Sequence, residues 1–198
     1  MAGASIAVAL VVDYSRRDTL RLLGFAPVAG LFDWPPAVGR PAPWFTLEST
    51  SGPIHTLWSY AGRVLLLMYE DRDSQELNAA LKSEVRRRIW AERLGPGLAV
   101  VPVADVRRYD YWPARKIVRN AVIERARALG TEILLDWKGD ILRRYSFQSP
   151  GSNVVLIGHD GLLLFHESGS LWPAQRRRFH QVLSEALEAR LRRRRGVG

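Results

Sequence analysis

Residues 63–76, R-V-L-L-L-M-Y-E-D-R-D-S-Q-E, decide the fold of this chain. The segment 64–69 is apolar throughout, which is typical of a strand that is covered on both faces in an α/β sheet. Asp73 is followed three residues later by Glu76, the spacing of a capping box, so we expect a helix to begin there. The stretch predicts a buried strand that leads into a helix through a loop rich in carboxylates.

The flanking segments alternate between strand and helix patterns. Ser51-Gly52 predicts a hairpin before residue 63, and His159-Asp160-Gly161 predicts a second hairpin. Helices that join the middle strands imply parallel pairing, and the last hairpin adds antiparallel strands, so we expect an α/β fold with a mixed central sheet. The expected strands are 41–47, 54–57, 64–69, 98–103, 132–135, 153–157 and 162–166, and the expected helices are 73–94, 113–130, 141–147 and 173–192.

Two of the expected helices carry apolar residues at helical spacing, which predicts their buried faces. In the helix 113–130 this face consists of Ile117, Val118, Ala121, Val122 and Leu129. In the last helix it consists of Phe179, Val182, Leu183, Ala186 and Leu187.

The composition is that of a globular chain without thiols. The chain has 198 residues, of which 47% are hydrophobic and 25% charged, enough for one domain with a sizeable core. There is no run of 18 apolar residues, so no ordinary membrane span is predicted. The absence of cysteine excludes disulfides, thiolate chemistry and cysteine metal sites within this chain.

The positive charge is unevenly distributed and almost entirely arginine. The net charge is +9, and residues 174–198, with eight arginines and two glutamates, supply +6 of it. Guanidinium groups suit bidentate contacts with phosphate, so nucleic acid or an anionic surface is a candidate partner. The alternative is that the arginines have no partner and reflect a biased composition, a solvated helix face and a soluble tail. The candidate anion-binding residues are Arg176, Arg177, Arg178, Arg192, Arg193, Arg194 and Arg195, with Arg86, Arg87 and Arg88 as a third basic segment and Tyr109, Tyr111 and Trp112 as candidates for stacking.

Residues 1–37 form an N-terminal extension ahead of a domain at 38–191, and 192–198 form an arginine-rich tail. Arg16-Arg17, followed by the apolar segment 22–32, resembles a twin-arginine export signal, with Ala37-Val38-Gly39 as a cleavage site. An amphipathic helix at 15–24 that docks on the domain is the alternative. Both a periplasmic and a cytoplasmic location therefore stay open.

Three motifs, in order, resemble those of the thioredoxin-like superfamily. Residues 38–47, V-G-R-P-A-P-W-F-T-L, resemble the opening of the alkyl hydroperoxide reductase/thiol-specific antioxidant (redoxin) and TlpA-like families. Residues 134–140, L-L-D-W-K-G-D, resemble their L-L-D-x-x-G segment, and Tyr145 with 155–161 resembles Y-x-V followed by F-L-I-D-x-x-G. The resemblance implies a thioredoxin-like three-layer α/β/α domain. The absence of cysteine, together with an export signal, resembles the periplasmic YtfJ-like branch.

The chain departs from the redox members of these families at the positions that carry their chemistry. The resemblance places Asp73 and Glu76 where the two cysteines would lie, and Ser152 where a cis-proline would lie, with Pro150 two residues earlier. The nucleophile, the resolving thiol and the cis-proline are thus expected to be absent. Thiol–disulfide exchange and peroxidase chemistry require a thiolate, so we assign no catalytic residue and no cofactor.

Two further groups of residues have both a functional and a structural interpretation. The carboxylates Glu70, Asp71, Asp73 and Glu76 could hold Ca²⁺ or Mg²⁺, or could simply stabilise the start of a helix. His55, His159, His166 and His180 show no metal-ligand spacing and are expected to be surface or core residues.

We therefore expect a cysteine-less, redox-inactive thioredoxin-like domain that binds or scaffolds a protein partner, a pseudoenzyme. The expected binding surface is the former active-site end, with Asp73, Glu76 and Ser152. Anion binding through the arginine-rich C-terminal helix and a divalent-metal-dependent enzyme that uses Asp73 and Glu76 are the two alternatives.

Overall fold

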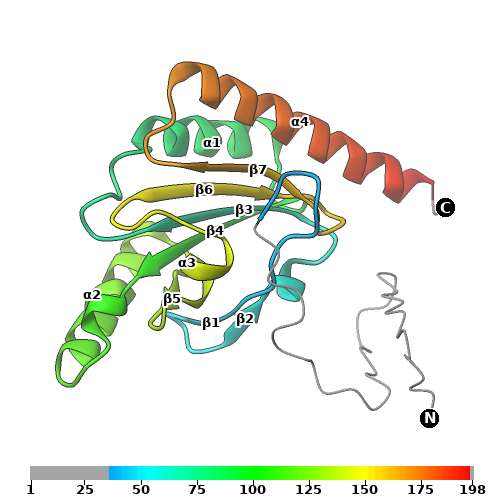
Figure 1. Ribbon diagram of the computed structural model, residues 1–198. Coiled ribbons are helices and arrows are strands. Elements are labelled where there is room, and N and C mark those ends of the chain that lie inside the picture. Colours follow the sequence, from blue (N-terminus) through cyan, green and yellow to red (C-terminus); the bar gives the residue numbers. More distant parts are fainter. Residues whose placement is uncertain (1–35, 197–198) are drawn as a thin grey trace, which may run out of the picture. The chain divides into compact units, whose positions relative to one another are not determined.

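The computed structural model describes residues 36–196. The twin-arginine pattern and the apolar segment after it lie outside the described residues. The described chain forms a seven-stranded sheet in the order β2-β1-β5-β4-β3-β6-β7, with helices packed on it (Figure 1). The strands are β1 (Thr46–Ser49), β2 (Ile54–Thr56), β3 (Val64–Glu70), β4 (Leu98–Asp105), β5 (Leu134–Asp136), β6 (Ser152–Ile157) and β7 (Leu163–Ser168). The helices are α1 (Ala79–Glu92), α2 (Ala114–Leu129), α3 (Asp140–Arg144) and α4 (Pro173–Arg195), with short 3₁₀ turns η1 (Leu57–Tyr60) and η2 (Arg107–Tyr109).

The sheet is mixed, as the sequence predicts. β3 pairs in parallel with β4, and β4 with β5, because α1 and α2 each return the chain to the same edge of the sheet. The hairpins β1–β2 and β6–β7 are antiparallel, and β6 also runs antiparallel to β3, with Leu66 opposite Leu156. The early and late parts of the sequence therefore meet in the centre of one sheet.

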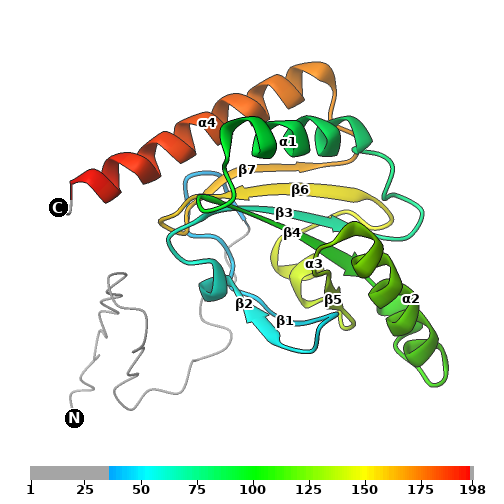
Figure 2. The same cartoon turned by 180° about the vertical axis from the view of Figure 1, so that it is seen from behind.

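Alternate residues of β3 point into two different apolar layers, which explains why the strand is apolar throughout. Leu67 lies in a cluster that includes Ile141 of α3. Leu66 lies in the opposite cluster, with Leu81 of α1 and Leu183 of α4. Figures 1 and 2 show α1 and α4 side by side over the same part of the sheet. The three-layer α/β/α arrangement is confirmed.

The predicted buried face of α2 is wrong at three positions. Ile117 is 66% exposed, Leu129 is 45% exposed and Ala121 is also exposed, whereas Val118 and Val122 pack against the protein. The reason is that α2 covers only a small separate cluster at the β4–β5 end of the sheet. That cluster consists of Val106, Leu135 and Trp137.

The last helix has the expected buried stripe but continues further than expected. Phe179, Leu183, Ala186 and Leu187 are buried. The helix extends through Arg195, so four of the C-terminal arginines lie in its last turns. Within residues 36–196, no helix is long and apolar enough to cross a membrane.

Candidate functional site

The carboxyl ends of β3, β4 and β5 meet the amino end of β6 at one edge of the sheet. Glu70, which ends β3, lies opposite Ser152, which begins β6, and Asp105 of β4 lies opposite Asp136 of β5. We call this edge, with the loops 71–78, 106–113, 145–151 and 169–172, the loop end. It holds the positions at which the resemblance places the redox residues of the related families.

Glu70 lies in a network of buried and half-buried polar side chains. Its Oε2 accepts a hydrogen bond from Lys82 Nζ at 2.7 Å, and its Oε1 accepts one from Ser152 Oγ at 2.8 Å. Ser152 is fully buried, and its Oγ also accepts from Asn78 Nδ2 at 2.8 Å. Burial raises the pKa of the Glu70 carboxyl, against the opposing effect of Lys82 and Ser152. The groups satisfy one another, which is the arrangement of a structural network.

Asn78 joins this network to the segment that precedes α4. Its Nδ2 donates to the carbonyl of Gly169 at 2.9 Å, and its Oδ1 accepts from the backbone N–H of Leu171 at 2.9 Å. The residue is 2% exposed and immediately precedes α1. Asn78 is not among the residues predicted from the sequence, although an asparagine directly before a helical pattern is a recognised helix-start signal.

The predicted capping box at Asp73 and Glu76 is wrong, because α1 begins at Ala79. Residues 72–78 form consecutive turns instead. Asp71 Oδ1 accepts a hydrogen bond from the backbone N–H of Ser74 at 2.8 Å, and such local side-chain bonds compete with helix formation. Asp73 and Glu76 are exposed and make no ion pair with any residue in the described range.

Ser152 lies inside the protein, and Pro150 lies on its surface. The Ser149–Pro150 peptide bond is cis, which corrects the expectation that the loop lacks a cis-proline. Of the expected surface residues Asp73, Glu76 and Ser152, only the two acids are exposed, because the Ser152 side chain is buried.

A second network ties the end of β4 to the Pro150 loop. Arg107 Nε and Nη2 donate to the two carboxylate oxygens of Asp105, each at 2.8 Å. Ser149 Oγ accepts from Arg107 Nη2 at 2.8 Å and donates to Asp105 Oδ2 at 2.9 Å. Burial would raise the pKa of Asp105, but the hydrogen bonds from Arg107 and Ser149 outweigh it and lower the pKa. None of these residues was identified from the sequence.

The buried Asp136 has a structural role that explains the L-L-D-x-x-G segment. Its Oδ1 accepts from the backbone N–H of Asp140 at 2.9 Å, and its Oδ2 accepts from that of Leu142 at 3.3 Å. The carboxylate therefore satisfies free N–H groups at the start of α3. Burial raises its pKa, although these backbone bonds oppose the shift.

Large apolar side chains are exposed in three loops of the loop end. Tyr111 and Trp112 are 61% and 86% exposed in the loop before α2. Leu77 is 47% exposed before α1, and Trp172 is 74% exposed before α4. Ser170 Oγ donates to the carbonyl of Leu77 at 3.1 Å, so the last two loops are in contact.

The described residues do not bring metal ligands together. In the range 36–196, no group of three or more histidine, aspartate or glutamate side chains is placed to hold a metal ion. Three histidines have other partners: His55 bonds to Tyr60 Oη, His166 to the carbonyl of Tyr145, and His180 to Glu84. The histidines and the acidic loop therefore give the metal-enzyme alternative no support.

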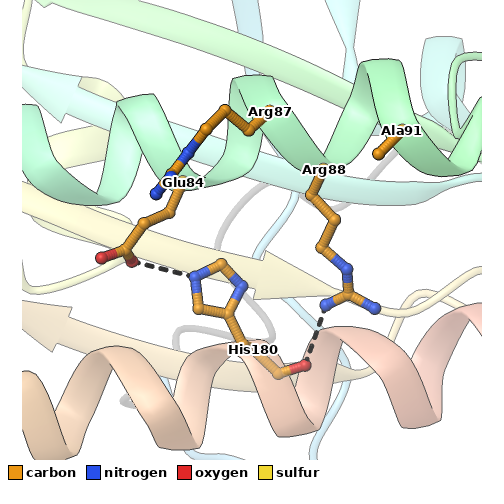
Figure 3. A pocket seen from close by; sticks show the side chains of 5 residues that line it. All are labelled: Glu84, Arg87, Arg88, Ala91 and His180. Carbon is orange, nitrogen blue, oxygen red and sulfur yellow. Dashed lines mark hydrogen bonds and ion pairs between the residues drawn. The ribbon is translucent and has the colours of Figure 1, made fainter.

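An open hollow of about 480 Å³ lies between α1 and α4, and Arg87 and Arg88 of the predicted basic segment on α1 line it together with His180 of α4. Figure 3 shows Glu84, Arg87, Arg88 and Ala91 of α1 and His180 of α4 around it. Arg88 donates to the carbonyl of His180 at 3.1 Å and to Ser184 Oγ at 2.7 Å. Arg87 makes no hydrogen bond or ion pair within the described range.

Comparison with known proteins identifies the fold. No protein-family model and no curated protein matches the chain. Among solved structures, a protein assigned as a thiol:disulfide interchange protein DsbE from Chlorobium tepidum is 19% identical with a TM-score of 0.58, covering 77% of this chain and 99% of that one. A protein assigned as a disulfide isomerase from Bacteroides thetaiotaomicron is 21% identical with a TM-score of 0.58, covering 77% and 91%. A thiol peroxidase from Chromobacterium violaceum is 16% identical with a TM-score of 0.56, covering 77% and 88%.

The chain therefore has the thioredoxin-like fold that the sequence motifs predict. It has this fold without any cysteine.

Proposed function

We propose that this protein is a redox-inactive thioredoxin-like domain that binds an extended polypeptide segment of a protein partner at its loop end. The observation that carries the proposal is the exposure of Leu77, Tyr111, Trp112 and Trp172 there. Exposed apolar groups gathered in one region are typical of interaction sites, and Trp and Tyr are the residues that most often dominate binding energy.

The arrangement of polar groups beneath these side chains supports binding rather than catalysis. Glu70, Ser152 and Asn78 bond to one another and to the backbone, so they hold the loops in place. A site whose loops are already fixed loses less entropy when a ligand binds. Thiol chemistry is excluded because the chain has no cysteine.

The charge of the loop end favours a particular kind of segment. Asp73 and Glu76 are exposed without an ion-pair partner among the described residues. A segment with an apolar or aromatic residue next to a lysine or arginine would contact both the exposed indoles and these carboxylates. Electrostatic complementarity of this kind chiefly adds specificity.

Selection from a random peptide display library, followed by affinity measurement on the selected peptide, tests this function. The double variant W112A/W172A should weaken binding at least tenfold, whereas W90A, which removes an equally exposed indole from α1, should not change it. Failure to select any peptide, or equal loss in both variants, would contradict the proposal. Insulin-reduction and peroxide assays should show no turnover, and robust turnover would exclude redox inactivity.

Export is a separate part of the proposal and rests on the twin-arginine pattern at Arg16-Arg17 alone. N-terminal sequencing of the protein from its native host tests it. A mature chain that begins close to residue 40 supports export and cleavage, and a chain that retains residues 1–37 contradicts it.

A further inference from the structure

The helices α1 and α4 hold nearly all of the excess positive charge. α1 contains four basic and two acidic residues, and α4 contains eight arginines and two glutamates. Together they contribute +8, against +9 for the whole chain. α2 is also basic, so the amount of charge alone does not distinguish these helices.

The pairing of the arginines does distinguish them. On α2, Arg115 and Arg119 pair with Asp110 and Glu48, and Arg127 pairs with Glu124. On α1 and α4 three of the four acids already have a basic partner: Glu84 pairs with Arg176 and His180, Glu92 with Arg88, and Glu188 with Arg192. The fourth, Glu185, accepts a hydrogen bond from Gln181 Nε2 at 3.0 Å. Seven arginines of these helices make no ion pair with any described residue: Arg86, Arg87, Arg177, Arg178 and the three at 193–195. These guanidinium groups are free to bind an external anion.

Like charges are held together at the far end of α4. Arg190 donates to the carbonyls of Gly62 at 2.8 Å and Pro96 at 3.0 Å, and Arg63 donates to those of Leu98 at 2.7 Å and Gly95 at 3.1 Å. Both side chains are thus fixed by the backbone, and neither makes an ion pair with a carboxylate of residues 36–196. Burial lowers the pKa of Arg190, and the nearby Arg194 and Arg63 lower it further.

One exposed indole lies near the arginines of α1 that make no ion pair within the described range. Trp90 is 80% exposed on α1 and follows Arg86 and Arg87 by four and three residues, which places the three side chains on one outward strip of the helix. Arg87 also borders the hollow between α1 and α4 (Figure 3). Guanidinium groups beside an exposed indole provide phosphate contacts and a stacking surface in one place.

We propose that the α1–α4 surface, with Arg86, Arg87, Trp90, Arg177 and the C-terminal arginines of α4, binds single-stranded nucleic acid. An acidic membrane is the less favoured partner, because the apolar faces of both helices are buried in the core through Leu81, Phe179 and Leu183. Little apolar surface remains to insert into lipid. A single strand is favoured over a duplex, because only unpaired bases are free to stack on Trp90.

Fluorescence anisotropy with a labelled single-stranded oligonucleotide of mixed sequence, over a series of salt concentrations, tests this inference. The slope of log K against log salt should be shallower in R86Q/R87Q by about 1.4, since each phosphate contact on a single strand contributes about 0.7. The control K116Q/R125Q removes two exposed charges from α2 that make no ion pair with described residues, and its slope should equal that of the wild type.

W90A separates stacking from charge. It should weaken binding at least about fivefold without changing the salt slope. Tighter binding to a duplex of the same sequence, an equal loss of slope in K116Q/R125Q, or binding to phosphatidylserine vesicles but not to the oligonucleotide would each overturn the proposal.

Discussion

Glu70 and Asp105 lie at the ends of adjacent parallel strands, yet their surroundings move their pKa values in opposite directions. Burial dominates at Glu70, whose partners are one lysine and one serine hydroxyl. At Asp105 the bidentate contact with Arg107 and the bond from Ser149 outweigh burial. The pKa of each carboxyl is thus set by the partners that the fold supplies.

The two networks also differ in how much of the chain they join. The Glu70 network connects β3, α1, β6 and the segment 169–171. The Asp105 network connects β4 only to the neighbouring turn and the exposed Pro150 loop. We infer that the first stabilises the whole domain and the second fixes one loop, and three predictions follow from this contrast.

The largest effect is expected for N78A, which leaves Ser152 Oγ, the Gly169 carbonyl and the Leu171 N–H without this partner. Buried polar groups that lose their partner each cost roughly 1–3 kcal/mol, so the free energy of unfolding should fall by about 3 kcal/mol in urea titrations. N120A makes the same chemical change at an exposed position of α2 and should stay within about 0.5 kcal/mol of the wild type. Similar losses in both variants would refute a central role for Asn78.

A serine-to-alanine substitution in each network is expected to change the free energy of unfolding by an intermediate amount. S152A removes a buried hydroxyl between Glu70 and Asn78 and should cost about 1–3 kcal/mol of unfolding free energy. S149A removes a hydroxyl in an exposed loop and should cost less than about 1 kcal/mol. The two unfolding curves, measured side by side, decide the comparison, and an equal or reversed order would contradict it.

The smallest effect is expected in the pH dependence of stability, where the two carboxyls act with opposite sign. The folded state lowers the pKa of Asp105, so its contribution is present above about pH 3.9 and is lost as the pH falls through the folded value. The folded state raises the pKa of Glu70, so the contribution of Glu70 to stability is present below about pH 4.3 and is lost as the pH rises through the folded value.

The variants D105N and E70Q separate these contributions. Melting temperatures across the acid range should show that D105N flattens the loss of stability at low pH. E70Q should flatten the decline above about pH 4.3. Changes of the same sign in the same pH window would show that the two carboxyls do not differ in the proposed way.

Much of the architecture could be predicted because its signals are local. The apolar run before Glu70 predicts β3, and Pro113 and Gly130 bracket α2, where Gly130 adopts the left-handed backbone with φ of 63°. The start of α1 could not be predicted in this way. The pattern at Asp73 and Glu76 fits a helix start, but Asp71 and Ser74 form a competing turn.

The candidate site was harder to predict, because its residues come from distant parts of the chain. Glu70 and Ser152 lie 82 residues apart in sequence, and Asp105 and Ser149 lie 44 apart. Sequence patterns single out Glu70 and Ser152 without indicating that the two are in contact, and no local pattern marks Asn78, Asp105 or Arg107 as part of the site. Periodicity and spacing describe one element at a time, whereas these contacts exist only once the sheet has formed.

The sequence by itself determined the thioredoxin-like fold and the exclusion of thiol chemistry, because apolar patterning, motif order and the absence of cysteine are properties of the chain. The tertiary structure decided which carboxylates are buried, which way their pKa values move and which arginines make no ion pair within the described part of the chain. These properties depend on distances between groups from separate segments, and only the folded chain sets those distances.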